Sequence, residues 1–248
     1  MLRSLRQLYR KKLGASDGDI GHVKDFYFND QQWAIRYVVT DTGSWLSGRL
    51  VLISPHVFGN LHQDGDCLLV NLTRQQIENS PAIESHKPVS RQYVEEYYRG
   101  VETWGAGGFP EAPPPLHFIP SEQASDDLHL QSTQALSGYS IQTSEGVIGH
   151  VIDFIMDDNS WAICHLVVET GHWYSHKEIV ISPKHIDRIS YEESRVFVNV
   201  TKQAIMEAPQ YHVTPLGEAY AIPGISTNEY NAINRNTSRL KTRGSFIL

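Results

Sequence analysis

The sequence predicts an all-β protein built from two small β-barrels in tandem, each followed by a short helix, with a Gly- and Pro-rich linker and an irregular C-terminal tail. Three observations support this fold class. The stretch GDIGHVKDFYFNDQQWAIRYVVTDTGSWLSGRLVLISP at 18–55 returns at 146–183 as GVIGHVIDFIMDDNSWAICHLVVETGHWYSHKEIVISP, without a gap. Each copy alternates short β-branched and aromatic runs with turn residues. The 248 residues suit two domains of about 100–150 residues.

The repeat extends beyond these two stretches at a constant spacing of 128 positions. Trp33 corresponds to Trp161, and Pro81 still corresponds to Pro209. Roughly 25 of the 66 positions from 16 to 81 are identical to their counterparts. This period is longer than the roughly 20–50 residues of solenoids and propellers, so it predicts two complete domains, each with its own core.

The elements of one copy follow from its turn signals and its alternation of apolar and polar residues. Asp17-Gly18 turns the chain into the first strand, and Ser54-Pro55 ends the third, because proline cannot donate to a central ladder. Thr73 is typical of a helix N-cap. The predicted strands are 20–28, 33–40, 50–53, one starting near Leu61, and 67–72, and the predicted helix ends at Glu78. Short strands with small turns favour a small antiparallel barrel.

Two local features stand out within the first strand of each copy. The alternation that buries Val23 would also bury Asp25, although Phe26 and Phe28 are the residues that belong in a core. A β-bulge at Asp25, and at Asp153 in the second copy, would reset the alternation. Gly21 and its counterpart Gly149 indicate a backbone that needs positive φ or close approach.

The expected domain boundaries are 5–95 for the first barrel, 100–128 for the linker, 130–212 for the second barrel and 213–248 for the tail. GAGGFPEAPPP is typical of a linker. Both termini are basic, with Arg3, Arg6, Arg10, Lys11 and Lys12 at one end. These charges suit either solubility or a weak contact with an acidic surface, such as lipid headgroups or RNA.

Composition narrows the class of protein. The net charge of −7 and the pI near 5.9 argue against a dedicated nucleic-acid binder. The sequence has neither the ~20-residue apolar run of a membrane helix nor the apolar core of a signal peptide, so we expect a cytoplasmic protein without a transmembrane segment. The two cysteines, Cys67 and Cys164, occupy non-equivalent positions and are expected to be free.

The order G-x-I-G-x-V-x-D-F, hairpin, glycine turn and I-S-P resembles the PRC-barrel family. The residues that carry the resemblance are Gly18-Ile20-Gly21-Val23-Asp25-Phe26 with Ile53-Ser54-Pro55, and Gly146-Ile148-Gly149-Val151-Asp153-Phe154 with Ile181-Ser182-Pro183. The resemblance implies a small β-barrel that acts as a protein-contact module. Members form the cytoplasmic part of the photosynthetic reaction-centre H subunit and the C-terminal domain of a ribosome-maturation factor. The family pattern supplies no catalytic residues.

The candidate site residues are those that recur in both copies. His22 and His150 are equivalent, but neither has a repeated zinc ligand at typical spacing. Trp45 and Trp173 follow a glycine turn, where they either contact a protein partner or pack over a barrel end. We therefore name these four as possible protein-contact residues and predict no catalytic, cofactor-binding or metal-binding residue. Asp25 and Asp153 are expected to accept backbone N–H bonds rather than to act as an acid–base pair.

These patterns predict a non-enzymatic protein-binding or scaffold protein without a cofactor. A protein partner is expected, a homo-oligomer and a peripheral membrane contact fit the pattern, and nucleic acid is disfavoured. The alternative functions are an RNA- or ribosome-associated factor, by analogy of fold, and an accessory to a membrane electron-transfer complex.

Overall fold

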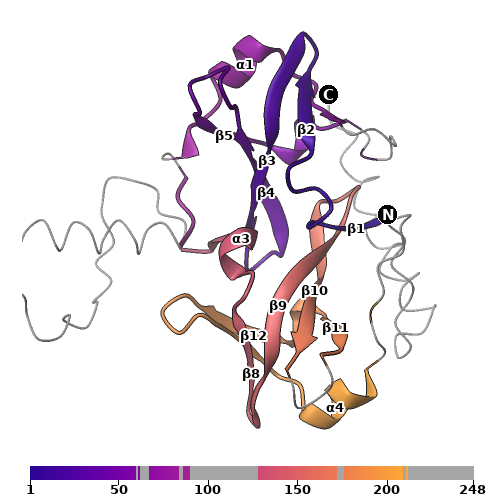
Figure 1. Cartoon of the computed structure of the whole chain (residues 1–248). Helices are drawn as coiled ribbons and strands as arrows, with labels where there is room; N and C mark the ends of the chain where they lie inside the picture. Colours follow the sequence, from indigo (N-terminus) through magenta and orange to yellow (C-terminus); the bar gives the residue numbers. More distant parts are fainter. Residues whose placement is uncertain are drawn as a thin grey trace, which may run out of the picture.

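The computed structural model describes residues 1–59, 61, 67–83, 86–89, 128–171, 176–208 and 211. These residues form a mostly β structure in which thirteen strands make one mixed sheet (Figure 1). The strands of the N-terminal half are β1 (Leu2–Ser4), β2 (Lys12–Ala15), β3 (Gly18–Asn29), β4 (Ala34–Asp41), β5 (Leu50–Ile53) and β6 (Cys67–Leu69). Those of the C-terminal half are β7 (Leu130–Ser132), β8 (Ser140–Thr143), β9 (Gly146–Asp157), β10 (Ala162–Thr170), β11 (Glu178–Ile181), β12 (Ile186–Ser190) and β13 (Arg195–Val198).

The helices in the described part of the chain are short. They are α1 (Arg74–Glu78), α3 (Thr133–Leu136) and α4 (Lys202–Glu207), with single 3₁₀ turns η1 (Pro55–Val57) and η4 (Pro183–His185). Thr73 caps α1 as predicted, because its side chain accepts from the Gln76 N–H while the Gln76 side chain accepts from the Thr73 N–H. Each half therefore has a short helix after its last strand.

The strand order shows how the two copies join. The main path runs β12-β13-β8-β9-β10-β4-β3-β2-β6, with β1 beside β9, β11 beside β10, β5 beside β4 and β7 beside β3. Equivalent strands begin 128 positions apart; β3 and β9 begin at Gly18 and Gly146. Two pairings, β2 with β6 and β8 with β13, are parallel, which corrects the expectation of a purely antiparallel arrangement.

The first strand of each copy pairs with the other copy. Strand β1 runs antiparallel to β9, and its counterpart β7 runs antiparallel to β3. We call 1–5 and 129–133 the exchanged arms. Figure 1 shows the indigo β1 lying beside β9, away from the other N-terminal strands. The predicted start of the first barrel at residue 5 thus leaves out a strand that belongs to the fold.

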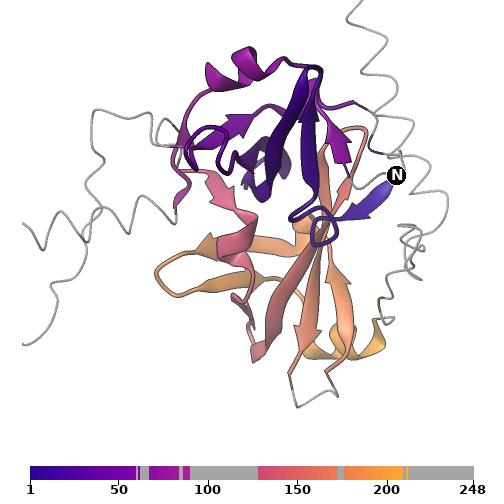
Figure 2. The same cartoon turned by 45° about the horizontal axis from the view of Figure 1, so that its top comes forward.

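The copies also meet directly between β4 and β10. Figure 2 shows the indigo and purple strands of the first copy above the salmon and orange strands of the second. Ala34 pairs with Ala162, the Ile35 N–H donates to the Trp161 carbonyl at 2.9 Å, and the Ile163 N–H donates to the Trp33 carbonyl at 2.6 Å. Both tryptophans have positive φ, 51° and 57°. They therefore belong to the turns before the strands, which corrects the predicted strand start at Trp33.

The larger of two hydrophobic clusters runs through both copies. One contiguous cluster contains Leu5 and Phe28 of the first copy together with Phe154 and Ile205 of the second. The Phe28 and Phe154 ring centroids are 5.9 Å apart. The expectation that each copy has its own core is therefore wrong, because the exchanged arms and the β4–β10 contact merge the two apolar interiors.

The two local predictions for the strand at 20–28, which is β3, and for its counterpart β9 are confirmed. The β3–β4 register shifts between Val23 and Asp25, which buries four consecutive residues from Asp25 to Phe28. The equivalent β9–β10 register shifts opposite Asp153. A Cβ on Gly21 would lie 2.0 Å from the Asp41 carbonyl oxygen, and one on Gly149 would lie 2.1 Å from that of Glu169. Only glycine, which has no Cβ, allows the two backbones to come this close.

The predicted tail at 213–248 and nearly all of the predicted linker at 100–128 lie outside the described residues. No helix among the described residues is long and apolar enough to cross a membrane.

Candidate functional site

The repeated carboxylates Asp25 and Asp153 hold the exchanged arms in place. Asp25 accepts from the Phe26 N–H at 2.7 Å and the Gln134 N–H at 3.0 Å, and also from the hydroxyls of Ser132 and Thr133. Burial raises the pKa of the Asp25 carboxyl, against the opposing effect of these donors. Asp25 thus accepts backbone N–H bonds, as predicted, and the hydroxyls of the arm in addition.

Asp153 repeats this arrangement with the N-terminal arm. It accepts from the Phe154 N–H at 2.7 Å, the Arg6 N–H at 2.9 Å and the Ser4 hydroxyl. Its pKa is also raised by burial. The pattern Leu-x-Ser, at Leu2–Ser4 and Leu130–Ser132, was the sequence signal that could have revealed the arms.

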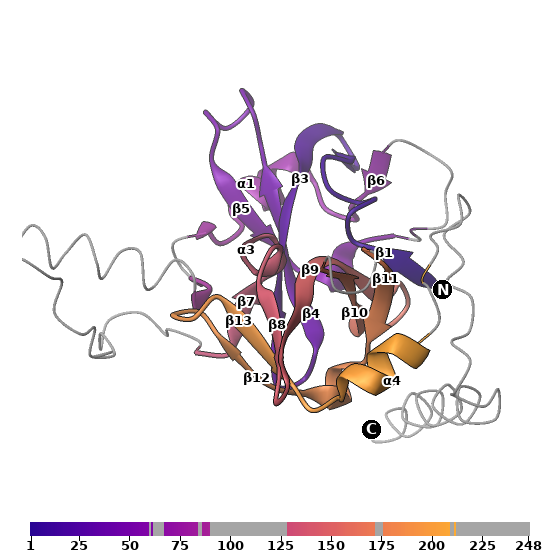
Figure 3. The same ribbon diagram turned by 60° about the horizontal axis from the view of Figure 1, so that its bottom comes forward.

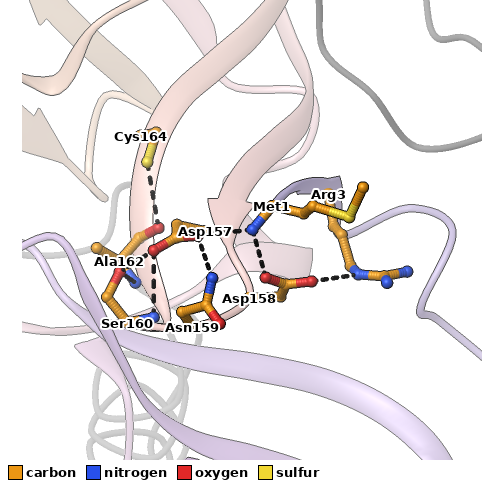
Figure 4. A network of polar contacts seen from close by, with 8 residues as sticks. All are labelled: Met1, Arg3, Asp157, Asp158, Asn159, Ser160, Ala162 and Cys164. Carbon is orange, nitrogen blue, oxygen red and sulfur yellow. Dashed lines mark hydrogen bonds and ion pairs between the residues drawn. The ribbon is translucent and has the colours of Figure 1, made fainter. Parts of the chain in front are cut away.

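A second repeated carboxylate ties down the outer end of each arm. Asp158 accepts from the Met1 ammonium group at 2.6 Å and from the Arg3 guanidinium at 2.9 Å, as Figure 4 shows. Asp30, its counterpart, contacts the His129 ring at 3.0 Å and accepts from the Gln131 amide at 2.9 Å. The equivalent turns thus bind equivalent arm positions, Asp158 through an ammonium and a guanidinium group and Asp30 through an imidazole and an amide.

The predicted histidines lie on the surface and face equivalent acids. His22 Nε2 is 3.8 Å from Asp41, and His150 Nε2 is 4.0 Å from Glu169, the residue equivalent to Asp41. Both imidazoles are more than 40% exposed. Pairs at this distance and exposure contribute little to stability. In the described ranges, no group of three or more His, Cys, Asp or Glu residues could hold a metal ion.

Trp45 is half-buried against the core, and the Arg74 guanidinium carbon lies 4.5 Å above its ring. A cation over an indole face is attracted by the ring's negative face. Trp45 therefore packs over the end of its copy, and its role as a partner contact stays a prediction. Trp173 lies outside the described residues.

Two half-buried groups of β10 carry shifted pKa values. Burial raises the pKa of the Cys164 thiol to about 11, and the thiol donates to the Ala162 carbonyl at 3.6 Å (Figure 4). Burial, together with Lys184, lowers the pKa of His165 to about 4. At neutral pH both side chains are uncharged, which suits packing rather than nucleophilic chemistry.

A groove of about 660 Å³ lies between the two copies. Its walls are Trp33 and the Asp30 turn of the first copy, the arm residue His129 with the preceding Leu128, and residues 186–192 of the second copy. We call it the inter-copy groove. Figure 3 shows the β12–β13 hairpin beside β7. The groove lies between this hairpin and the first copy. No sequence pattern predicted the groove, because it forms only when the arm of one copy crosses to the other.

Strand β12 has an edge that no described strand covers. Within the described part of the chain, β12 pairs with β13 and with no other strand. All five residues of β12, and therefore side chains from both of its faces, line the groove, so its free edge borders the groove. Leu128, 49% exposed, adds an apolar side chain that has no cover in the described structure. Such an edge can accept an added strand.

Comparison with models of known protein families gives no match, and no curated protein matches the sequence.

Proposed function

We propose that the chain is a non-enzymatic binding or scaffold protein that holds an extended segment of a partner protein in the inter-copy groove. The observation that carries this proposal is the free edge of β12 along the groove. Strand addition supplies affinity through main-chain hydrogen bonds and specificity through alternate side chains. Leu128 and Trp33 offer apolar contacts for those side chains.

The repeated carboxylates support a non-catalytic function. Asp25 and Asp153 have their oxygens engaged by arm donors, and Asp30 and Asp158 grip the arm ends. A general acid or base needs access to a substrate proton, which these contacts leave no room for. Two tandem PRC-type barrels, merged by exchange of their first strands, remain our proposal for the architecture.

Site-specific photo-crosslinking in the native cell tests the function. A photoreactive residue at Leu128 or at Ser190, on opposite walls of the groove, should capture the same partner. The matched control is Val147, an apolar residue that is 47% exposed and outside the groove. Capture of one protein from both groove positions and not from Val147 supports the proposal. Equal capture from Val147, or capture from neither groove position, contradicts it.

A further inference from the structure

A cluster of cations lies on the outer face of the β2–β3 hairpin, built from residues that the groove does not use. Lys12 on β2 is the register partner of His22 on β3. His22 and Lys24 flank buried Val23, so both point outward from the sheet. The Arg10 N–H donates to the Val23 carbonyl at 2.9 Å, which places Arg10 beside them. We call these four residues the cationic hairpin face.

The cationic hairpin face borders a pocket on the protein surface. Arg10, Lys12 and His22 line a pocket of about 470 Å³ together with Gly21 and Asp19. Asp19 is the one acidic residue in that lining. Asp41 approaches from β4, 3.8 Å from His22. The three basic side chains of the face, Arg10, Lys12 and Lys24, thus outnumber these two carboxylates by one.

The three basic side chains of the face make no polar contact within the described structure. Across the described ranges, the side chains of Arg10, Lys12 and Lys24 have no hydrogen-bonded or ion-paired partner. Arg10 and Lys12 are both exposed. Neighbouring like charges repel one another, and because only two carboxylates lie close by, the face keeps a positive charge that a bound anion would neutralise.

The second copy shows that the fold does not require these charges. Its residues at the positions of Arg10, Lys12 and Lys24 are Gly138, Ser140 and Ile152. The same strand pairing forms there, between β8 and β9. Three cations are thus a property of the first copy alone, whereas the histidine is common to both.

Arg10 also adopts a strained backbone. Its φ is 62°, in the left-handed region, and the equivalent Gly138 has φ 95°. Glycine adopts such angles freely, but a residue with a Cβ loses about 1–2 kcal/mol there. A strained non-glycine residue at a position where the other copy has glycine points to a use for its side chain.

We propose that the cationic hairpin face binds a phosphate group, supplied by either a free phosphorylated ligand or a lipid headgroup. A guanidinium provides paired donors that match phosphate oxygens, and an ammonium adds a point charge. His22 supplies a further ring donor at the pocket wall. This site is separate from the groove, and its test does not depend on the proposed partner.

The test is an NMR titration of the ¹⁵N-labelled full chain with sodium pyrophosphate at low salt. The amides that shift should cluster at 10–12 and 21–24. The variant R10G/K12S introduces the residues of the second copy, so its fold has a precedent within the same molecule. We expect it to bind pyrophosphate ~10-fold or more weakly, the loss of about 1.4 kcal/mol.

The matched control is R36Q/K184Q, which removes the same number of charges from exposed positions outside the pocket. Its affinity should stay within about twofold of the wild type. Equal weakening in both variants would show a net-charge effect and overturn the proposal. Shifts centred elsewhere, or no shifts, would also overturn it.

Sedimentation with vesicles distinguishes the two sources of phosphate. Vesicles of phosphatidylcholine with phosphatidylglycerol should retain the wild type and not R10G/K12S if the ligand is a lipid headgroup. Pyrophosphate binding without vesicle binding assigns the site to a free phosphorylated ligand. Vesicle binding that survives R10G/K12S would contradict a role of this face at the membrane.

Discussion

The Ser4 hydroxyl donates a hydrogen bond to the buried carboxylate of Asp153, 149 positions further along the chain. Ser132 makes the same contact with Asp25. Each serine belongs to an exchanged arm and each aspartate to the β-bulge of the other copy. The two contacts therefore join the halves of the protein, and they explain why a carboxylate recurs at a position that the strand pattern assigns to the core.

Ser4→Ala and Ser132→Ala should each lower the free energy of unfolding by about 1–3 kcal/mol, because each leaves a buried carboxylate oxygen without its donor. Urea unfolding followed by far-UV circular dichroism measures the loss. The exposed Ser144 provides the control, and Ser144→Ala should change stability by less than about 0.5 kcal/mol. Equal stability of S4A and the control would show that the arm contact is dispensable.

The pH dependence of stability should carry the signature of the buried carboxylates. Burial raises the pKa of Asp25 and Asp153 above the ordinary value of 3.8. The folded state then holds these protons more tightly than the unfolded state, so their contribution is complete below pH 3.8 and is lost as the pH rises through the folded-state pKa values.

Asp25→Asn removes one of these titrations while it keeps the side-chain shape. The stability of the wild type relative to D25N should therefore be greatest at acidic pH and decline as the pH rises above 3.8. Urea titrations at a series of pH values measure this difference. A difference that grows with pH would mean that the donors outweigh burial at Asp25.

Gly21→Ala and Gly149→Ala should each be strongly destabilising, by about 2–4 kcal/mol, since the new Cβ would meet a carbonyl carbon and oxygen of the neighbouring strand. The loss should be larger at Gly21, whose φ of 129° is itself unfavourable for a residue with a side chain. Thermal unfolding measures the loss of stability in both variants. Gly59→Ala is the control, because its Cβ would have ordinary contacts at 3.7 Å.

Asp158→Asn should loosen the N-terminal arm without unfolding the protein. The substitution removes the negative charge that faces the Met1 ammonium and the Arg3 guanidinium. Hydrogen exchange of the β1 amides should accelerate several-fold, while the amides of β4 keep their protection. Asp30→Asn should have the same effect on β7. Uniform acceleration across the sheet would contradict a local role for these carboxylates.

The sequence predicted several elements of one copy because they depend on local chemistry, but it missed β1 and β2, and the strand predicted at 67–72 is observed only at Cys67–Leu69. Leu50–Ile53 is observed with the predicted ends, and the Thr73 cap is present. The bulge was predictable because Asp25 conflicts with the alternation around it. Glycine at position 21 indicated close approach because the second copy kept it.

The relationship between the copies was not predictable from either copy alone. Strand β1 has three residues, too few for a periodic signal, and nothing local says which sheet it joins. The parallel pairing of β2 with β6 joins distant segments. The groove and the merged core follow from that long-range pairing, so the site could not be predicted before the topology was known.

The central claim is that the exchanged arms and shared core make the two copies one folding unit. A protease site inserted between Gly107 and Gly108 of the full chain, cleaved in the folded protein and followed by native mass spectrometry, tests it most directly. We predict that both fragments remain together at the mass of the uncut chain, 28.1 kDa plus the inserted site, and separate only in denaturant. Fragments that separate in buffer, each still folded, would contradict the claim.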